Sequence, residues 1–289
     1  NPLNMELKVL NVESGLSHNR VQTLHFDADG ILWVGTQGGV SLVDPVSFTV
    51  KKVIKAGAGE DNISSNSVFS FCEDGKGNMY VSTSRGLNRI DMKSGKIRKF
   101  YVKDGLANDN IYAILKDEAG VFWLSTNKGI SKMEVTGSNG EQYHFKNYEP
   151  IDGLQEGEFI QGSYFLNPTT REMFFGGING FNSFIPASIK ENTHVPKVVI
   201  TSFKRFGKPV ALDTSIFYKK FLELSYKDNF FSIEFVSLDF TMPSKNLYSY
   251  KMEGVDQDWS IPSPIRFASY TNLEGGDYTF RVRASNNDG

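Results

Sequence analysis

The chain has 289 residues and a formal net charge of −2, with 39% hydrophobic and 22% charged residues. This composition excludes a disordered chain, and the near-neutral charge argues against a nucleic-acid binder, which needs a basic face. A single cysteine, Cys72, excludes an internal disulfide framework and a cysteine-based zinc site, and no apolar run is long enough to cross a membrane.

The first part of the chain repeats itself. Copies start at Gly15, Asn62, Gly105 and Gly153, which lie 47, 43 and 48 residues apart. The first three copies carry an aspartate 12 residues after the start and a large aromatic residue 18 after it, namely Asp27, Asp74 and Asp117, and Trp33, Tyr80 and Trp123. The fourth copy has a three-residue insertion near Asn167. Repeats of this length are typical of β-propeller blades.

Each copy predicts a four-stranded meander, with strands at 21–26, 31–35, 39–44 and 49–54 in the first copy. The Asp-x-x-Gly pattern favours a tight hairpin in which the aspartate caps the turn. Calcium binding by these aspartates is disfavoured because no copy carries the closing glutamate of a calcium loop. The recurring aromatic residue is expected to pack between neighbouring sheets rather than to stack on sugars. No metal or cofactor site is predicted.

Two interpretations of the propeller ends remain open. Residues 6–12 align with residues 96–102, which predicts the outermost strand of a blade, whereas the fourth copy lacks an outer strand. The first strand would then either complete the fourth blade and close a four-bladed ring, or belong to a larger propeller of which these repeats are the C-terminal part. We favour the larger propeller.

A different strand pattern follows the polar connector at 190–196 and predicts a second domain. The expected domains are residues 1–189, with the propeller repeats, and 190–289, an immunoglobulin-like sandwich without its cysteine pair. Tyr248 and Tyr250 are two residues apart and therefore face one side of a strand, where core packing is expected. Trp259 and Tyr278 are assigned structural roles as well. The closing turn signal at 287–289 predicts that the last strand of the sandwich is missing.

The motifs resemble a known family. Gly15-Leu16, Asp27-x-x-Gly30 and Leu32-Trp33-Val34-Gly35-Thr36 resemble the two-component regulator propeller repeat. The stretches 248–259 and 276–289 resemble the opening and close of the triple-tyrosine (Y_Y_Y) domain, with the patterns Tyr248-x-Tyr250-x-Met252-x-Gly254-x-Asp256-x-x-Trp259 and Gly276-x-Tyr278-x-Phe280-x-Val282-x-Ala284-x-Asn286-x-Asp288-Gly289. Together these motifs are typical of the extracytoplasmic sensor region of hybrid two-component systems in glycan-degrading Gram-negative bacteria.

This resemblance implies a function for the chain. It implies the periplasmic part of an inner-membrane protein, joined to the membrane only through a helix that the chain lacks. It also implies a homodimer in the parent receptor that binds an oligosaccharide and relays the signal to a histidine kinase, and so controls polysaccharide utilisation. Neither a nucleic acid nor a cofactor is an expected partner.

The expected ligand face comprises two loops of each blade, the loop before the inner strand and the loop between the second and third strands. Amide and charged side chains there would bond sugar hydroxyls, and arginine or lysine would meet uronates or sulfates. The principal candidates are Arg20, Gln37, Arg85, Lys128 and Asn179. Further candidates on the first loop are His18, Asn19, Asn66, Asn108, Asp109, Gln155, Glu156 and Glu158.

Two other functions stay open as alternatives. Glu156 and Glu158 would serve as the acid and nucleophile of a propeller glycoside hydrolase, or the propeller would belong to a lyase. The third possibility is a scaffold that binds another protein. We expect no enzyme activity, because the four histidines lack metal-ligand spacing and the sequence has no Gly-x-Ser-x-Gly elbow.

Overall fold

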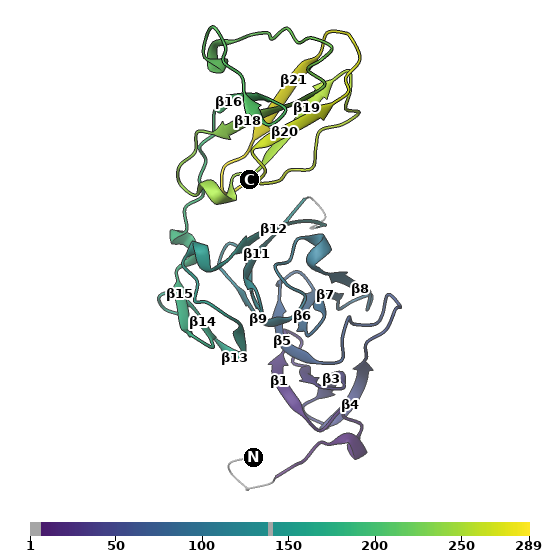
Figure 1. Ribbon diagram of the computed structural model, residues 1–289. Coiled ribbons are helices and arrows are strands. Elements are labelled where there is room, and N and C mark those ends of the chain that lie inside the picture. The colour runs from purple at the N-terminus through teal and green to yellow at the C-terminus, as the bar shows by residue number, and fades with distance from the viewer. Residues whose placement is uncertain (1–6, 138–140) are drawn as a thin grey trace. The chain divides into compact units, whose positions relative to one another are not determined.

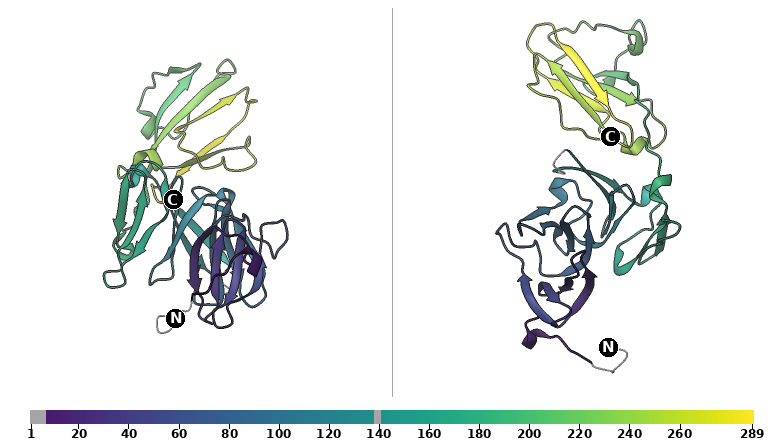
Figure 2. Two further views of the ribbon diagram at one scale, coloured as in Figure 1. Left: turned by 90° about the horizontal axis from the view of Figure 1, so that it is seen from below. Right: turned by 180° about the vertical axis from the view of Figure 1, so that it is seen from behind.

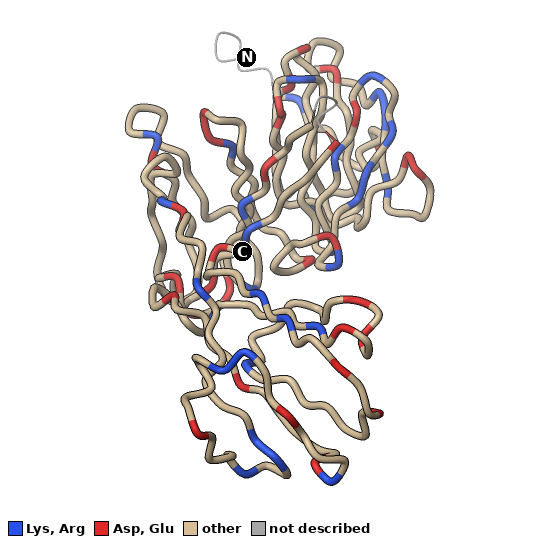
Figure 3. The backbone as a smooth tube through the Cα atoms, turned by 90° about the horizontal axis from the view of Figure 1, so that it is seen from above, with Lys and Arg blue, Asp and Glu red and all other residues tan. Residues whose placement is uncertain are grey.

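A computed structural model describes residues 7–137 and 141–289, and the fold is all-β, as predicted. The chain divides into two compact units, Asn1–Ile189 and Lys190–Gly289 (Figures 1 and 2). Lysines, arginines and acidic residues are interspersed along both units (Figure 3), in keeping with the small net charge. In the part of the chain that the structure describes, no helix is long and apolar enough to cross a membrane.

The first unit contains four antiparallel meanders in chain order, which we call blades 1 to 4. Blade 1 comprises β1 (Val21–Phe26), β2 (Leu32–Thr36), β3 (Gly39–Asp44) and β4 (Thr49–Ile54). Blade 2 comprises β5 (Val68–Glu73), β6 (Asn78–Thr83), β7 (Gly86–Asp91) and β8 (Ile97–Phe100). Blade 3 comprises β9 (Ile111–Lys116), β10 (Phe122–Thr126), β11 (Gly129–Thr136) and β12 (Gln142–Tyr148). Blade 4 comprises β13 (Phe159–Leu166), β14 (Met173–Gly177) and β15 (Gly180–Phe184).

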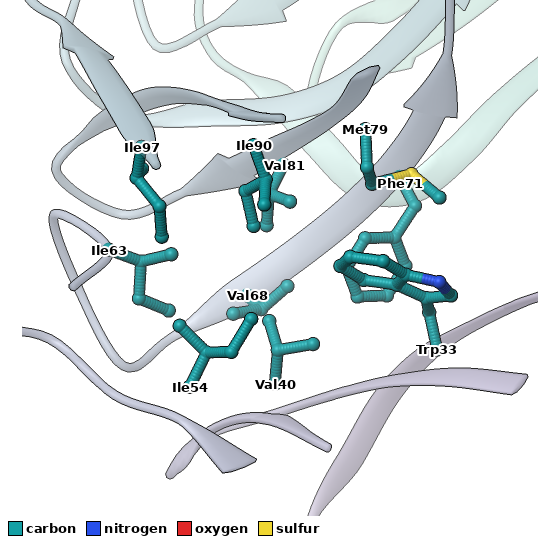
Figure 4. Close-up of a cluster of buried hydrophobic side chains, with 10 residues drawn as sticks. All are labelled: Trp33, Val40, Ile54, Ile63, Val68, Phe71, Met79, Val81, Ile90 and Ile97. Atoms are coloured by element: carbon teal, nitrogen blue, oxygen red, sulfur yellow. The ribbon is translucent and has the colours of Figure 1, made fainter. Parts of the chain in front are cut away.

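Apolar side chains hold each blade against the next. The inner strands β1, β5, β9 and β13 contact one another in chain order. Figure 4 shows ten buried side chains between blades 1 and 2, where the Trp33 ring meets the Phe71 ring edge-on at 5.9 Å. Tyr80 packs on Phe122 between blades 2 and 3, with ring centroids 4.3 Å apart. Trp123 lies in the core between blades 3 and 4. The recurring aromatic residue thus fills each interface between blades.

The two end blades each have one open face. Val21 and Leu24 of blade 1 are 43% and 61% exposed, whereas Ile111 and Ile114, at the same register of blade 3, are 0% and 2% exposed. On blade 4, Phe181 is 68% exposed, whereas Ile130, at the same register of blade 3, is buried. The difference arises because blade 3 has neighbours on both faces, whereas blades 1 and 4 each have one neighbour among the described residues.

The prediction of an outer strand at residues 6–12 is wrong for the described residues 7–12, and Glu6 lies outside them. Residues 7–11 form no strand, because no described strand pairs with them. Val12–Ser14 instead form a 3₁₀ helix, which recurs before blades 3 and 4 as Val102–Asp104 and Pro150–Asp152. Blade 4 lacks an outer strand, as predicted, and residues 7–11 do not complete it.

The second unit is a sandwich of two antiparallel sheets. One has the order β17-β16-β18-β20, and the other pairs β19 with β21. The strands are β16 (Val198–Arg205), β17 (Lys208–Pro209), β18 (Phe230–Ser237), β19 (Tyr248–Glu253), β20 (Phe267–Thr271) and β21 (Thr279–Ala284). The remaining 3₁₀ helices are Pro186–Ser188 in the first unit, and Ile216–Tyr218 and Pro243–Lys245 in the second. Phe203, Phe231, Phe235, Tyr248 and Tyr270 are among the buried core residues.

Tyr248, Tyr250 and Tyr278 lie in or beside this core, whereas Tyr218 and Tyr226 are exposed. Tyr248 is buried, and its hydroxyl accepts a hydrogen bond from the Ser237 backbone N–H at 3.1 Å. Tyr250 and Tyr278 are half-buried members of the same cluster. Trp259 is half-buried, and the Arg283 guanidinium lies over its ring at 4.3 Å. The hydrogen bond between Ser237 and Tyr248 ties β18 to β19 of the facing sheet.

Candidate functional site

The loop before each inner strand lies beside the hairpin between the second and third strands of the same blade. In three blades a hairpin N–H donates to a carbonyl of that loop: Gln37 to Arg20 at 3.2 Å, Ser84 to Ser67 at 3.1 Å and Ile178 to Glu158 at 3.0 Å. Hairpins also reach the next blade, since Gly39 N–H donates to the Asn66 carbonyl and Gly86 N–H to the Asp109 carbonyl. The two loops therefore form one surface, which we call the loop face.

Repeated polar side chains hold the loop face in place. A side chain of the third strand accepts a hydrogen bond from the loop backbone in every blade: Ser41 from Ser17 at 3.0 Å, Asn88 from Ser64 at 2.8 Å, Ser131 from Ala107 at 3.0 Å and Asn182 from Gln155 at 2.8 Å. A buried threonine also closes the hairpin in three blades, by donating to the Gly39, Gly86 or Gly129 carbonyl. The scaffold is thus held by similar hydrogen bonds in each blade.

Several candidates on the first loop serve this scaffold. The side-chain oxygens of Asn19, Asn66 and Asp109 accept hydrogen bonds from backbone N–H groups of the preceding segments, at 2.9, 2.7 and 2.7 Å. Within the loops, His18 Nδ1 accepts from the Arg20 N–H and Asn108 Oδ1 from the Asn110 N–H. These side chains act as caps, a role that short polar residues take in turns generally.

Blade 4 uses two further candidates to join its loops. Gln155 Oε1 accepts from the Asn179 backbone N–H at 3.1 Å, and its Nε2 donates to the Gly157 carbonyl at 3.0 Å. The Asn179 side chain donates to the Glu156 carbonyl. Asn179 is therefore exposed on the loop face, but its amide is already engaged with the protein.

Three of the four remaining principal candidates present free polar side chains, and the fourth, Lys128, is only weakly paired. Arg20, Gln37 and Arg85 are exposed, and their side chains make no hydrogen bond or ion pair with the described residues. Lys128 Nζ lies 4.0 Å from Glu149 Oε1, and because both side chains are well exposed this pair contributes little stability. The loop face brings the five candidates to one surface, with Arg20 beside Gln37 on blade 1 and the others on separate blades.

The sequence reasoning missed a polar cluster on blades 3 and 4. Asn110 Nδ2 donates to the Tyr112 hydroxyl and to Asn127 Oδ1, both at 3.1 Å, and the Tyr112 hydroxyl lies 3.5 Å from Glu158 Oε2. Of these four residues only Glu158 was a candidate. A position-by-position comparison of the repeats could have singled out Tyr112, because the same position is Gln22 in blade 1 and Phe69 in blade 2.

At the other end of blades 1 to 3, the aspartates cap turns, as predicted. Asp27 Oδ1 accepts hydrogen bonds from the Asp29 and Ile31 backbone N–H groups at 3.0 and 2.8 Å. The second carboxylate oxygen takes a side-chain donor in all three copies: Trp33 Nε1 to Asp27 at 2.8 Å, Asn78 Nδ2 to Asp74 at 2.6 Å and Trp123 Nε1 to Asp117 at 3.1 Å. Across residues 7–137 and 141–289, no three His, Cys, Asp or Glu side chains are grouped to hold a metal ion.

Comparison with protein families matches both parts of the chain. Residues 15–38, 62–85 and 105–128 match the two component regulator propeller, in the register of the first three repeats. Residues 239–289 match the Y_Y_Y domain, which contains β19, β20 and β21. The predicted family resemblance is therefore confirmed.

Two individual proteins extend this likeness over nearly the whole chain. A curated protein of Formosa agariphila named histidine kinase P4 is 30% identical over 94% of this chain, which spans 20% of that protein. The crystal structure of the extracellular domain of a putative hybrid two-component system from B. thetaiotaomicron superposes with a TM-score of 0.81 at 26% identity. That match covers 98% of this chain and 38% of the solved one. The chain thus carries matches to two-component regulator propeller repeats followed by a match to the Y_Y_Y domain, and it is similar over most of its length to proteins of two-component systems.

Proposed function

We propose that this chain is the ligand-sensing part of the extracytoplasmic region of a hybrid two-component sensor, and that it binds an oligosaccharide on the loop face. The observation that carries the proposal is the set of exposed, unengaged side chains of Arg20, Gln37 and Arg85 on a scaffold that repeats from blade to blade. The similarity to an extracellular domain of a putative hybrid two-component system supports the sensor role.

The chemistry of these side chains suits a saccharide ligand. Guanidinium groups and amides donate several hydrogen bonds in fixed geometry, which suits the closely spaced hydroxyls of a sugar. In this proposal the ligand is bound without turnover, and the Y_Y_Y domain relays the binding event towards a histidine kinase. A periplasmic location, a homodimer and control of polysaccharide utilisation belong to the same proposal.

Calorimetric titration of the chain with a panel of plant and host oligosaccharides tests this function. We expect at least one member to bind with a Kd on the order of 1 μM, or about −8 kcal/mol. Chromatography of the mixtures should show no cleavage products. Arg85→Ala should weaken binding, whereas Lys76→Ala, which removes an exposed cation from the opposite end of blade 2, should not. If no saccharide of the panel binds, the proposed function is wrong.

A further inference from the structure

The first three inner strands each carry one extra residue near their start. In β1 the pairing with β2 shifts between Val21 and Thr23, and in β5 the pairing with β6 shifts between Val68 and Ser70. In β9 the residue without a partner on β10 is Tyr112. These are β-bulges at Gln22, Phe69 and Tyr112. A bulge redirects the side chain of the extra residue out of the regular alternation of the strand.

The bulge residues form a line from blade to blade. Ser67 Oγ of blade 2 donates to Gln22 Oε1 of blade 1 at 3.5 Å. The rings of Phe69 and Tyr112 lie 5.7 Å apart between blades 2 and 3. The Tyr112 hydroxyl then donates towards Glu158 of blade 4. We call this line the inner rim. It lies at the ends of the inner strands that join the loop face.

The inner rim is polar and loosely bonded where blade 3 meets blade 4. The Tyr112 hydroxyl accepts from Asn110 Nδ2 at 3.1 Å, but its own donation to Glu158 spans 3.5 Å, the outer limit of such a bond. Partial burial and the nearby Glu158 carboxylate raise the pKa of Tyr112, so its hydroxyl stays protonated at neutral pH. A donor and a carboxylate acceptor therefore stand close together without a strong bond to each other.

The repeats show that the fold does not require these residues. The fifth residue after each repeat start is Arg20, Ser67, Asn110 or Glu158, so its side chain is cationic in blade 1, neutral in blades 2 and 3 and anionic in blade 4. By contrast, the residue one position earlier in the first three blades is Asn19, Asn66 or Asp109. In each of these blades its side-chain oxygen accepts a hydrogen bond from a backbone N–H of the preceding segment. Positions that vary on a constant scaffold are available for recognition.

We propose that Tyr112, Asn127 and Glu158 form a subsite that binds an uncharged, hydroxyl-bearing sugar unit of the ligand. This inference rests on the proposed function and specifies the ligand class. The half-buried Tyr112 offers an aromatic edge and a hydroxyl donor, and Glu158 accepts from sugar hydroxyls. The Glu158 carboxylate repels a uronate or a sulfate at this place. The subsite therefore selects against acidic sugars, although Arg20 and Arg85 on blades 1 and 2 would favour them.

The test uses a panel of neutral oligosaccharides together with oligogalacturonides and sulfated oligosaccharides, titrated against the whole chain. We expect neutral members to bind more tightly than acidic ones. Tyr112→Phe, which keeps the ring, should weaken neutral binding about fivefold, the effect of one hydrogen bond. Glu158→Gln should reduce the ratio of the affinity for neutral members to the affinity for acidic members at least tenfold. Glu118→Gln removes an exposed carboxylate from the other end of blade 3 and should change neither.

The outcomes separate the two proposals. If saccharides bind but acidic members bind better, or if Tyr112→Phe and Glu158→Gln leave the affinities unchanged, the subsite is wrong and the sensor function stands. If no member of either panel binds, both proposals fail. Thermal denaturation of each variant checks that a loss of binding does not come from unfolding.

Discussion

In blades 1 to 3 the second carboxylate oxygen of the turn aspartate accepts a hydrogen bond from one of two kinds of side chain, so the arrangement of one blade can be built into another. In blade 3 the indole N–H of Trp123 donates to Asp117. In blade 2 the aromatic residue is Tyr80, which cannot supply this donor, and the amide of Asn78 donates to Asp74 instead. Val121 occupies the register of Asn78 in blade 3. The double substitution Val121→Asn and Trp123→Tyr should therefore rebuild the arrangement of blade 2.

The expected magnitudes follow from these contacts. Trp123→Tyr removes a hydrogen bond to a carboxylate, which contributes about 1.5–3 kcal/mol, and leaves a small cavity that adds about 1 kcal/mol. The free energy of unfolding should fall by about 3 kcal/mol, which corresponds to roughly 6–12 °C in Tm for a unit of this size. Val121→Asn alone should also destabilise, because Val121 packs against the core between blades 3 and 4. In the double variant the new amide bond should recover at least about 1 kcal/mol relative to the sum of the single effects.

Urea and thermal denaturation of the native chain, the two single variants and the double variant measure this coupling. Near-UV circular dichroism is the suitable signal, because it reports on aromatic packing in all four chains. A coupling energy of zero, or one that makes the double variant worse than additive, would refute the reasoning. It would mean that the aspartate is satisfied by the turn backbone alone.

Three further predictions concern other parts of the chain. Burial raises the pKa of the Cys72 thiol to about 11, so at pH 8 the native chain should react with a thiol reagent about a hundredfold more slowly than the chain unfolded in guanidinium, and equal rates would contradict this. The ion pair with Lys51 and the hydrogen bonds from the turn N–H groups lower the pKa of Asp44 to about 2. The stabilisation of the folded chain by ionised Asp44 is therefore present above the pKa of the unfolded chain and is lost as the pH falls through about 2. Lys51→Met should raise that pKa, as measured by carbon NMR titration, and an unchanged value would assign the shift to the turn backbone. Phe181→Ser should lower the binding of a hydrophobic dye, since Phe181 is exposed on the open face of blade 4, and unchanged dye binding would show that this face is covered.

The sequence predicted the blades well, because their signals are local. Strands β1, β3 and β4 have the bounds expected from the first repeat, since turn residues and alternating apolar residues determine them. The failure at residues 7–11 has a physical cause. A strand needs a neighbouring strand for its backbone hydrogen bonds, and the aligned strand β8 has one in β7, whereas residues 7–11 do not.

The candidate site was less predictable from the sequence. Asn19 and Asp109 are polar loop residues like Arg20, and their capping role appears only once the loop conformation is known. Tyr112 was missed because a bulge breaks the alternation by one residue, and only the pairing of β9 with β10 reveals it. The bulge recurs at the same register in the first three blades, but the sequence alone does not show which residue lacks a partner on the neighbouring strand.

The open faces of blades 1 and 4 have a consequence for how the first unit comes apart. A blade held on both sides must lose two interfaces before its amides exchange with solvent, whereas an end blade loses only one. In a linear array with nearest-neighbour coupling, protection from hydrogen exchange should therefore peak in β5, β6, β9 and β10 and decline towards both ends. Under native conditions, local opening would then start at β1 and β13 and spread inward.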